Sequence, residues 1–271
     1  MRAGEGLTTA CMVDRANRRL VVKGYPDGRS PEFWVDEWLK TAAKYDLEKI
    51  WLWAFPEDVP VFFARGFALE GWLDDGRAGR RSASMAYYLK AARGISRKLA
   101  AEDELLQAVT QKPTGALPAL PEGLSARSLD LRDNEEIAAI LGEVFSTYPN
   151  PVSETDYIKG LLRQGCLFEG VFSGQTLVSV AAAYPDVAMG CCEMTDCATR
   201  PKFRGLALTE RLLKRLGRRR ELEDLTLYTL ARAGSYGVNR VFHKLGYRFR
   251  GRLINNCDID GGFEDMNLLV R

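Results

Sequence analysis

Residues 193–216 read EMTDCATRPKFRGLALTERLLKRL, and this stretch decides the expected fold. Its first part is typical of a strand, predicted over 191–199, and its last part is typical of a helix. One apolar stripe marks that helix, formed by Leu208, Leu212, Leu213 and Leu216. Between strand and helix, Gly205 and Ala207 are small enough for backbone N–H groups to approach a ligand. The helix dipole adds a positive end, so the stretch suits a pyrophosphate, although the loop taken alone favours a plain tight turn.

Short elements continue on both sides of this stretch. Upstream, we predict strands over 124–129, 166–172 and 176–184 and helices over 133–147 and 154–164. Asp133 and Glu136 have the spacing of a capping box at the start of the first of these helices. Downstream, we predict strands over 225–230, 247–256 and 263–270 and a helix over 235–245. The expected order of the C-terminal part is βααββ-β-α-β-α-ββ.

Residues 113–123, PTGALPALPEG, form the expected domain boundary. Three prolines and two glycines in eleven positions exclude a regular helix or a central strand. The predicted domains are therefore 1–112 and 124–271, joined by a linker at 113–123, and a length of 271 residues fits two domains. In the first domain we predict strands over 19–23, 50–55, 67–73 and 82–89. We predict its helices from Ser30 onward, over 59–65 and over 91–111.

The two domains share a pattern at a constant spacing of 180 residues. The matching pairs are Phe62 with Phe242, Gly66 with Gly246, Gly71 with Gly251 and Leu73 with Leu253. Both parts also share the order β-α-β-α-ββ. We interpret this as a degenerate internal duplication, with chance similarity as the alternative. In the first copy the sequence around Gly28 lacks the R-G-x-A loop of the second.

Composition excludes several classes of function. The chain has 38 basic and 36 acidic residues, a formal charge of +2, which does not predict a nucleic-acid partner. Its single histidine, His243, excludes metal sites and mechanisms that need two. The six cysteines include no C-x-x-C pair, and neither a signal peptide nor a membrane span is recognisable. We expect a reduced, soluble, cytoplasmic protein with no metal and no membrane partner.

The loop and its flanks resemble the GCN5-related N-acetyltransferase (GNAT) superfamily. The pyrophosphate loop of that family is R/Q-x-x-G-x-G/A, and residues 202–207, KFRGLA, fit it apart from the lysine at the first place. Residues 242–247, FHKLGY, resemble the Y-x-K-L-G-F segment of the family. The resemblance covers about 124–271. It implies the mixed α/β GNAT fold in the C-terminal domain and a degenerate, partial GNAT-like domain before it.

The end of the chain is similar to the C-terminus of the β-lysine N6-acetyltransferases. The similar positions are Tyr247, Gly251, Leu253, Asn255, Asn256, Ile259, Gly261, Glu264, Met266 and Asn267. Residues 148–151, YPNP, and 193–196, EMTD, are similar as well. The resemblance implies transfer of acetyl from acetyl-CoA, as co-substrate, to the terminal amine of β-lysine. The product of that reaction is a compatible solute.

The resemblance also implies which residues hold acetyl-CoA. The pyrophosphate is assigned to Lys202, Arg204, Gly205, Leu206, Ala207, Leu208 and Thr209, and the pantetheine to Cys197, Ala198 and Thr199. A further contact is assigned to Asn239, with Ser235 as the alternative. A nucleophilic role for Cys197 is possible in principle, but no histidine lies near it in sequence, and a buried strand cysteine is the favoured interpretation.

Acetylation of an amine needs a proton acceptor, because a lysine-type ammonium with a pKa of about 10.4 is almost fully protonated at neutral pH. The resemblance implies Glu193 as this base, and the alternative is a carboxylate that only binds the ammonium. Asp196 would face the other side of a regular strand, and a bulge would change that. The acid tyrosine of the family is replaced by Phe242, which leaves Tyr236, our prediction, or Tyr228.

A small amino-acid substrate needs fixed donors for its carboxylate and acceptors for its ammonium. The candidate substrate-binding residues are Tyr148, Asn150, Asp196, Asn255, Asn256, Glu264 and Asn267. Turn chemistry is the alternative for the asparagine pair. The N-terminal domain is expected to shape the acceptor site or to form a homodimer contact. Two other functions stay open: an acyltransferase acting on aminoacyl-tRNA or a protein lysine, and an acyl-CoA-sensing module without turnover.

Overall fold

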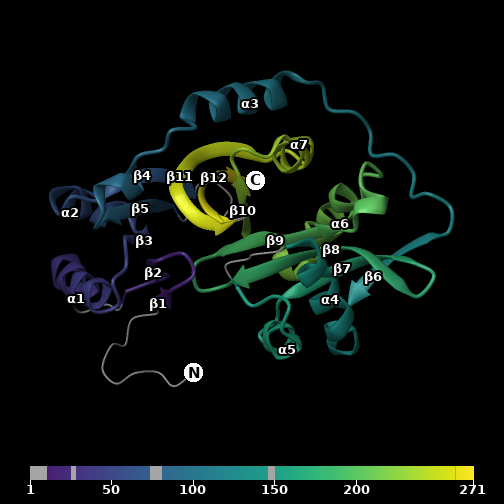
Figure 1. Cartoon of the computed structure of the whole chain (residues 1–271), viewed down its shortest axis with the longest axis horizontal. Coiled ribbons are helices and arrows are strands. Elements are labelled where there is room, and N and C mark those ends of the chain that lie inside the picture. Colours follow the sequence, from purple (N-terminus) through teal and green to yellow (C-terminus); the bar gives the residue numbers. More distant parts are fainter. Residues whose placement is uncertain (1–10, 26–28, 74–80, 146–149, 260) are drawn as a thin grey trace.

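The computed structural model describes residues 11–25, 29–73, 81–145, 150–259 and 261–271. Within these residues the strands form a single twelve-stranded sheet, in the order β1-β2-β3-β5-β4-β11-β12-β10-β9-β8-β7-β6. Figure 1 shows β1 to β5 with α1 and α2 at one end of the molecule, and α4, α5 and α6 around the strands at the other end. The expected mixed α/β architecture is confirmed.

The N-terminal half supplies β1 (Cys11–Asp14), β2 (Arg19–Val22), β3 (Lys49–Ala54), β4 (Ala68–Leu73) and β5 (Ser82–Tyr88). Its helices are α1 (Pro31–Lys44), α2 (Val59–Ala64) and α3 (Leu99–Gln111), with 3-10 turns at Pro56–Asp58 and Ala91–Gly94. The predicted start of α1 is confirmed, because the Phe33 N–H donates to the Ser30 hydroxyl and Pro31 opens the helix. The short strand β1 was not predicted.

The C-terminal half begins with β6 (Leu124–Leu129), α4 (Asn134–Val144), α5 (Thr155–Arg163), β7 (Leu167–Ser173) and β8 (Thr176–Asp186). It continues with β9 (Cys191–Thr199), α6 (Leu208–Leu216), β10 (Thr226–Arg232), α7 (Tyr236–Lys244), β11 (Arg248–Ile259) and β12 (Gly262–Val270). Short 3-10 turns lie at Leu131–Asp133, Pro201–Phe203 and Arg220–Leu222. The leucine stripe of α6 is buried as predicted, so this helix packs on the sheet. Residues 113–121 form neither helix nor strand, and we propose them as part of the linker between 1–112 and 124–271.

Two details of the prediction are wrong. The helix expected over 91–111 is interrupted before Leu99, because the buried guanidinium of Arg93 donates to Glu48, the Asn17 carbonyl and the Asn255 carbonyl and so fixes a turn there. The capping box is formed by Asp130 and Asp133, not by Asp133 and Glu136. The Asp133 carboxylate accepts hydrogen bonds from the Asp130 N–H and from Arg127, so it does not cap α4.

The two halves repeat one topology. In the N-terminal half β1 pairs antiparallel with β2, β2 parallel with β3, β3 antiparallel with β5, and β4 antiparallel with β5. In the C-terminal half β8, β9, β10, β12 and β11 pair with one another in the same order and senses. The strand order is therefore palindromic about the contact between β4 and β11.

Local geometry repeats at the predicted spacing of 180 residues. Gly66 and Gly246 have φ angles of 85° and 88°. The rings of Phe62 and Phe67 pack edge to face at 5.4 Å, and those of Phe242 and Tyr247 do so at 5.0 Å. Register shifts interrupt β4 between Leu69 and Gly71 and interrupt β11 between Phe249 and Gly251. These repeats support the interpretation as an internal duplication.

Gly71 and Gly251, one of the predicted equivalent pairs, are Cα partners across β4 and β11. Two equivalent residues can face each other only where an approximate twofold axis passes between them. Their backbones approach closely, since a Cβ at Gly251 would lie 2.1 Å from the Glu70 carbonyl oxygen. The junction of the two halves therefore depends on glycine at this point.

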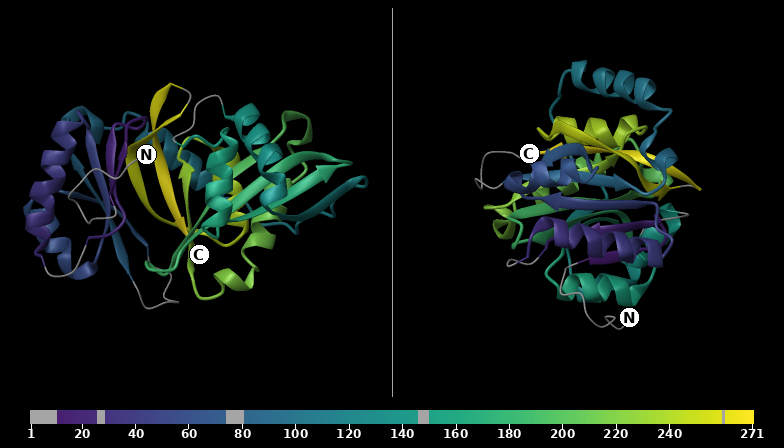
Figure 2. Two further views of the ribbon diagram at one scale, coloured as in Figure 1. Left: turned by 90° about the horizontal axis from the view of Figure 1, so that it is seen from below. Right: turned by 90° about the vertical axis from the view of Figure 1, so that its left-hand side faces the viewer.

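The sheet curls so that its two halves pack against each other. In the sheet order β3 and β10 are separated by four strands, yet the rings of Trp53 and Tyr228 lie 5.6 Å apart. Val21 and Trp51 share the same buried cluster with Cys191 and Tyr228. In the left view of Figure 2 the yellow strands β11 and β12 lie between the purple-blue half and the green half. The inner face of the C-terminal half is thus covered by the N-terminal half.

Candidate active site

The candidate site lies where β9 and β10 separate. These parallel strands pair from Cys191 with Thr226 to Glu193 with Tyr228, and pairing stops there although β9 runs on to Thr199 and β10 to Arg232. Beyond the last pair, β9 stays bonded only to β8 among the described strands. Beyond this point, the backbone groups of β9 and β10 that face each other have no hydrogen-bond partner in the opposite strand.

The predicted pyrophosphate loop lies at the carboxyl end of β9. Gly205 has φ 82° and Ala207 φ 53°, so two closely spaced residues are left-handed just before α6. Backbone in this conformation turns successive N–H groups to one side and forms an anion-binding concavity. No side chain caps α6, and a Cβ added to Gly205 would meet nothing within 4 Å. The loop therefore has room and free donors for an anionic group.

Side chains around the loop divide into exposed and buried ones. Lys202, Arg204 and Leu206 are exposed, whereas Leu208 is buried in the core beneath α6. A ligand contact at Leu208 can therefore involve only its backbone. The hydroxyl groups of Thr199 and Thr209 lie 3.1 Å apart and tie the end of β9 to the first turn of α6.

The backbone of β9 carries a bulge at the centre of the site. Thr195 pairs with Ala182 and Ala198 with Val180, so Asp196 and Cys197 together oppose the single residue Ala181. Asp196 adopts φ 47°. The conditional expectation that Asp196 faces away from Glu193 therefore does not hold, because the bulge turns its carboxylate to the side of Glu193, where it accepts a hydrogen bond from the Tyr184 hydroxyl.

Glu193 lies on the inner face of the sheet beside Tyr228. Burial raises the pKa of its carboxyl group above the ordinary value, and the neighbouring Asp196 charge adds to the rise. The Lys23 and Arg19 charges and a hydrogen bond from the Tyr228 hydroxyl act in the opposite direction. A half-buried carboxylate with a raised pKa is the kind of group that accepts a proton near neutral pH.

The bulge also places Cys197. Its side chain packs toward the core under α6, and burial raises the pKa of its thiol well above the usual range. A thiol with a raised pKa is a poor nucleophile. The interpretation of Cys197 as a strand cysteine is thereby supported. Ala198 is buried on the opposite face, so both residues can offer a ligand only backbone groups.

Three aromatic residues are relevant to the identity of the general acid. Phe242 is buried against Tyr247 and carries no ionisable group. Tyr228 is buried, and burial followed by the Glu193 charge raises the pKa of its hydroxyl well above the ordinary value. Tyr236 is the first residue of α7 and is 40% exposed. The structure therefore places Tyr236 at the carboxyl end of β10 with its ring accessible, whereas Tyr228 lies against the base.

Asn239 and Asn267 form hydrogen bonds inside the protein. Asn239 is 1% exposed, and its amide donates to the Arg232 and Ser235 carbonyls while its oxygen accepts from Asn267. The side-chain oxygen of Asn267 accepts a hydrogen bond from the guanidinium of Arg252. Every polar side-chain atom of both residues is thus engaged within the protein, which ties α7 to β12. The assignment of Asn239 to the cofactor and of Asn267 to the substrate stays a prediction.

Glu264 and Asn255, two other polar candidates of β11 and β12, also have internal partners. Glu264 forms a two-pronged ion pair with Arg232, and Asn256 is fully buried. The Asn255 amide donates to the carbonyls of Arg93 and Ile95. Of the loop between α4 and α5, Asn150 is half-buried, while Tyr148 lies outside the described residues.

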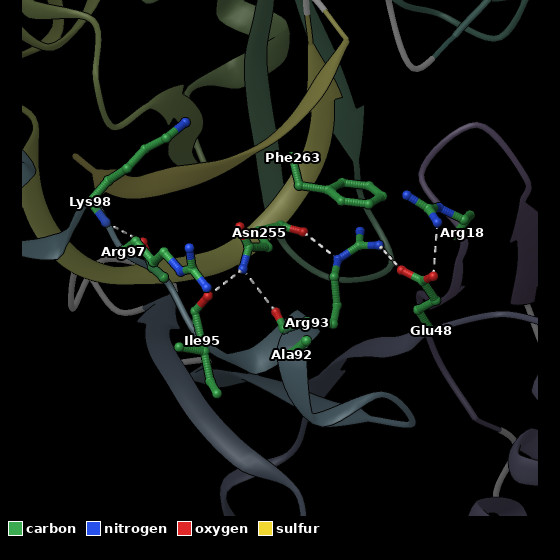
Figure 3. A pocket seen from close by; sticks show the side chains of 10 residues that line it. Arg18, Glu48, Ala92, Arg93, Ile95, Arg97, Lys98, Asn255 and Phe263 are labelled. Carbon is green, nitrogen blue, oxygen red and sulfur yellow. Dashed lines mark hydrogen bonds and ion pairs between the residues drawn. The ribbon is translucent and has the colours of Figure 1, made fainter.

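Asn255 borders a cavity of about 370 Å³ that the N-terminal half shares with the hairpin of β11 and β12. Figure 3 shows Phe263 over the guanidinium of Arg93, and Glu48 between Arg93 and Arg18. The Cζ atom of the Arg93 guanidinium lies 3.2 Å from the centre of the Phe263 ring. These contacts hold the end of the hairpin that is close to its turn against the N-terminal half.

The N-terminal half contributes groups to the site that the sequence did not assign. Lys23, just after β2, acts electrostatically on Glu193, and Trp53 of β3 packs on Tyr228. Tyr157 of α5 and Tyr184 of β8 lie near Asp196. Nothing in the local sequence indicates these contacts, because they join residues far apart in the chain. Their aromatic and basic character is visible, but their proximity depends on the curl of the sheet.

Within the described residues, no group of three or more histidine, cysteine, aspartate or glutamate side chains is arranged to hold a metal ion. The helices that the structure describes include none that is both long enough and apolar enough to cross a membrane.

The chain has sequence relatives among characterised proteins, although no family model matches it. The N-acetyltransferase YodP of Bacillus subtilis is 31% identical over 264 residues, which cover 97% of this chain and 95% of that protein. A β-lysine N6-acetyltransferase of Methanosarcina mazei is 38% identical over 155 residues, 56% of either chain. One from Methanococcus maripaludis is 27% identical over 214 residues, 76% of either chain.

Among solved structures, Arabidopsis thaliana NAA60 in complex with acetyl-CoA has 15% sequence identity and a TM-score of 0.46, covering 55% of this chain and 97% of that chain. The fold and the sequence relatives together define the class of protein, an N-acetyltransferase of the GNAT superfamily. Within that class, the chain belongs to the same family as the N-acetyltransferase YodP, and it is similar to the β-lysine N6-acetyltransferases.

Proposed function

We propose that this N-acetyltransferase uses acetyl-CoA as donor and acetylates the terminal amine of a free diamino acid, β-lysine. The observation that supports it most directly is the pair of carboxylates, Glu193 and Asp196, turned to one side at the point where β9 and β10 separate. Two relatives are named β-lysine N6-acetyltransferases, and the full-length relative is named only as an N-acetyltransferase.

The donor is assigned to backbone groups and a few side chains. The N–H groups around Gly205 and Ala207 and the first turn of α6 suit the pyrophosphate, with Lys202 and Arg204 as exposed cations nearby. The end of β9, 197–199, which is not paired with β10, suits the amides of the pantetheine arm. Together these groups would present the thioester at the place where the two strands separate.

Glu193 is the general base in this proposal. It takes a proton from the terminal ammonium of the acceptor, directly or through one water, and Asp196 holds its pKa up. The free amine then attacks the thioester carbonyl, and the new C–N bond forms as the C–S bond breaks. The nitrogen loses its second proton to solvent in this step. Tyr236 returns a proton to the leaving sulfur, and Tyr228 orients the Glu193 carboxylate by its hydrogen bond.

An acceptor comparison tests this function. The purified protein is incubated with acetyl-CoA and β-lysine, α-lysine, a lysine peptide or no acceptor, and release of free thiol is followed together with the product mass. We expect turnover with β-lysine to exceed that with α-lysine and to leave the peptide unmodified. Equal rates with all acceptors, or preference for the peptide, would contradict the β-lysine assignment. Acetyl-CoA binding without thiol release would favour an acyl-CoA-sensing module.

The product proposed here is N6-acetyl-β-lysine, a zwitterion without net charge that suits the role of a compatible solute. Such a role is compatible with action inside the cytoplasm, which we propose as the location. Measurement of the compound in cells grown at low and high salt, with and without the gene, tests both points. Accumulation that is independent of the gene would contradict them.

A further inference from the structure

The cavity of about 370 Å³ between the N-terminal half and the hairpin of β11 and β12 carries charge that the proposed reaction does not use. Its lining includes four cations, Arg18, Arg93, Arg97 and Lys98, whereas Glu48 is the one carboxylate among its described lining residues. Figure 3 shows Arg97 and Lys98 at one end of the cavity and Arg18 with Glu48 at the other. Four cations against one carboxylate leave the lining with an excess of positive charge.

The single carboxylate, Glu48, is already shared by three cations. One of its oxygens lies 2.9 Å from Arg18 and 3.0 Å from Lys90, and the other lies 3.0 Å from Arg93. The Arg93 side chain is 2% exposed, so its charge is almost fully removed from water. A buried cation needs compensating negative charge nearby, and a carboxylate that also serves two other cations supplies only part of it.

Arg93 also has donors to spare. A guanidinium carries five N–H groups, and those of Arg93 form three hydrogen bonds. The acceptors are the Asn255 carbonyl, the Glu48 carboxylate and the Asn17 carbonyl. The other two N–H groups have no acceptor among the described residues. A buried arginine at the wall of a cavity thus has two N–H groups left for an acceptor that enters the cavity.

The segment 95–98 adds further donors at the other end of the cavity. The Ser96 oxygen accepts from the Lys98 N–H at 3.1 Å, and its hydroxyl hydrogen has no acceptor among the described residues. Arg97 and Lys98 are exposed, and their side chains form no hydrogen bond or ion pair with the part of the chain that the structure describes. Helix α3, 13 residues long, begins directly after Lys98 without a side-chain cap. Its positive dipole end adds to the charge of the cations.

The walls of the cavity are fixed by hydrogen bonds between the two halves. The Asn255 amide donates to the carbonyls of Arg93 and Ile95 at 3.1 Å, and the Arg93 Nε donates to the Asn255 carbonyl at 2.7 Å. These bonds hold the donors in place before a ligand arrives, which lowers the entropic cost of binding. Ile95 and Phe263 contribute apolar surface, and the volume is that of a small-molecule site. The cavity therefore suits an anion that also has an organic part.

We propose that this cavity binds a small organic phosphate, whose phosphate group is held by Arg93, Ser96, Arg97 and Lys98. A phosphate dianion matches the excess of positive charge, and its oxygens can accept from several donors at once. Helix N-termini favour the same group. The occupant contacts both halves and so stabilises their junction. The cavity shares no lining residue with the loop around Gly205, so this site is independent of the proposed function.

Calorimetric titration with ribose 5-phosphate and with inorganic phosphate, at constant ionic strength, tests the site. Both ligands are titrated into the wild-type protein and into Gly205→Glu, which places a carboxylate in the other candidate anion site. We expect ribose 5-phosphate to bind both proteins with the same Kd. We also expect it to bind more tightly than inorganic phosphate, because its sugar contacts the apolar part of the wall. The melting temperature should rise with its concentration.

Charge-removing variants locate the site. The double variant Arg97→Ala/Lys98→Ala removes two exposed cations and should raise the Kd for ribose 5-phosphate about tenfold, as for loss of a charge-assisted contact. Arg97→Lys keeps the charge and should keep most of the affinity. The matched control, Lys112→Ala/Arg218→Ala, removes one exposed lysine and one exposed arginine elsewhere and should bind as the wild type does. If the double variant is not folded by circular dichroism, Arg97→Glu replaces it, with the same expected loss.

Four results would overturn the assignment. The wild-type protein could bind neither ligand, or Gly205→Glu could abolish binding, which would place the phosphate in the loop before α6. The double variant could bind as tightly as the wild type, which would remove Arg97 and Lys98 from the site. The control pair could lose as much affinity as the double variant, which would mean that the ligand responds only to net charge. None of these results bears on turnover with acetyl-CoA, so the proposed function stands or fails separately.

Discussion

The two halves of the sheet share a topology but differ at the ends of their central parallel strands. In the C-terminal half, β9 and β10 pair over three residues and then separate, with a bulge at Asp196. In the N-terminal half, β2 pairs with β3 along its whole length, from Arg19 to Val22, with no shift of register. The same order of strands and helices can therefore form a sheet whose central parallel strands separate or one in which they stay paired. We call the C-terminal half the open half and the N-terminal half the closed half.

The closed half is filled by an aromatic side chain. The Tyr25 ring packs against Trp38, Phe55 and Phe62 at 5.5 to 5.9 Å, and its hydroxyl donates to Asp58 at 2.5 Å. Tyr25 lies three residues after the end of β2, and in the other half the residues after β9 form the loop around Gly205. The comparison teaches that a bulge and a small-residue loop distinguish the candidate site from its companion.

The largest expected effect concerns the loop that the two halves do not share. Gly205→Glu places a carboxylate in the proposed anion site and should abolish acetyl-CoA binding, because like charges repel there. Arg29→Glu introduces the same side chain just before α1, the corresponding helix of the closed half, and should leave binding unchanged. Calorimetric titration with acetyl-CoA measures both. Normal binding by Gly205→Glu would remove the donor site from this loop.

The proposed base comes next. Glu193→Gln keeps the shape of the side chain but cannot accept a proton, so kcat should fall by about 10²- to 10⁴-fold. The KM for acetyl-CoA should change little, since the donor is held by the loop. Glu57→Gln, in the closed half, is the control and should retain full activity. Steady-state kinetics measure both variants. If the kcat of Glu193→Gln stays within a few-fold of wild type, Glu193 is not the base and can only bind the substrate.

The junction between the halves should respond to added bulk in a graded way. A Cβ at residue 251 would lie 2.1 Å from the Glu70 carbonyl oxygen, whereas one at residue 71 would meet the Arg250 carbonyl oxygen at 2.9 Å. We expect Gly251→Ala to lower the free energy of unfolding by about 3 kcal/mol and Gly71→Ala by about 1 kcal/mol. Gly160→Ala, in α5 with open space around it, should stabilise by about 0.5–1 kcal/mol.

Denaturant unfolding followed by circular dichroism measures these differences. If both junction variants were as stable as wild type, the close approach of β4 and β11 would be wrong. The approximate twofold relation would then lose its central contact.

A pH profile sharpens the role of the bulge in the open half. The Asp196 charge adds to the effect of burial in raising the pKa of Glu193, so Asp196→Asn should lower that pKa. Because the base must be deprotonated, the acidic limb of kcat/KM should move to lower pH. Asp186→Asn, at the end of β8, should leave the limb in place. A shift to higher pH would show that Asp196 does not act on Glu193 by its charge.

The smallest effect concerns α3 of the first half and β12 of the second. Burial, followed by the charge of Asp265 and a hydrogen bond to it, raises the pKa of Glu102 to about 7. The folded protein holds this proton more tightly than the unfolded chain, so stability should decline as pH rises from about 4.5 through about 7 and level off above. Glu102→Gln should flatten that decline in thermal unfolding measured across this range. An unchanged slope would assign it to other groups.

Much of the fold could be predicted from local sequence. The leucine stripe of α6, the prolines of 113–123 and the glycines after α2 and α7 act on residues close in the chain. The repeat at 180 residues was visible for the same reason, because it rests on glycine and aromatic residues that act on nearby backbone and packing. Boundaries failed where a distant partner decided the backbone, as at Arg93, whose bonds to Asn17, Glu48 and Asn255 end a turn that the sequence extends into a helix.

The candidate site could be predicted only in part. Glu193 and the loop around Gly205 were found from their place in a strand–loop–helix unit. The polar residues Asn239 and Asn267 carried the same kind of signal, but the structure engages their amides with each other and with the backbone. Trp53 could not be found, since its contact with Tyr228 depends on the curl of a twelve-stranded sheet.

The contact of Gly71 with Gly251 has a consequence for assembly. In a single GNAT-type unit, β11 would be the edge strand of the sheet, and its backbone groups could pair with another chain. Here β4 of the same chain pairs with β11 at that edge. The two halves are therefore joined like the subunits of a heterodimer that are linked in one chain. Among the described strands, the outer ones left to a second copy are the four-residue β1 and the six-residue β6 at the far ends of the sheet.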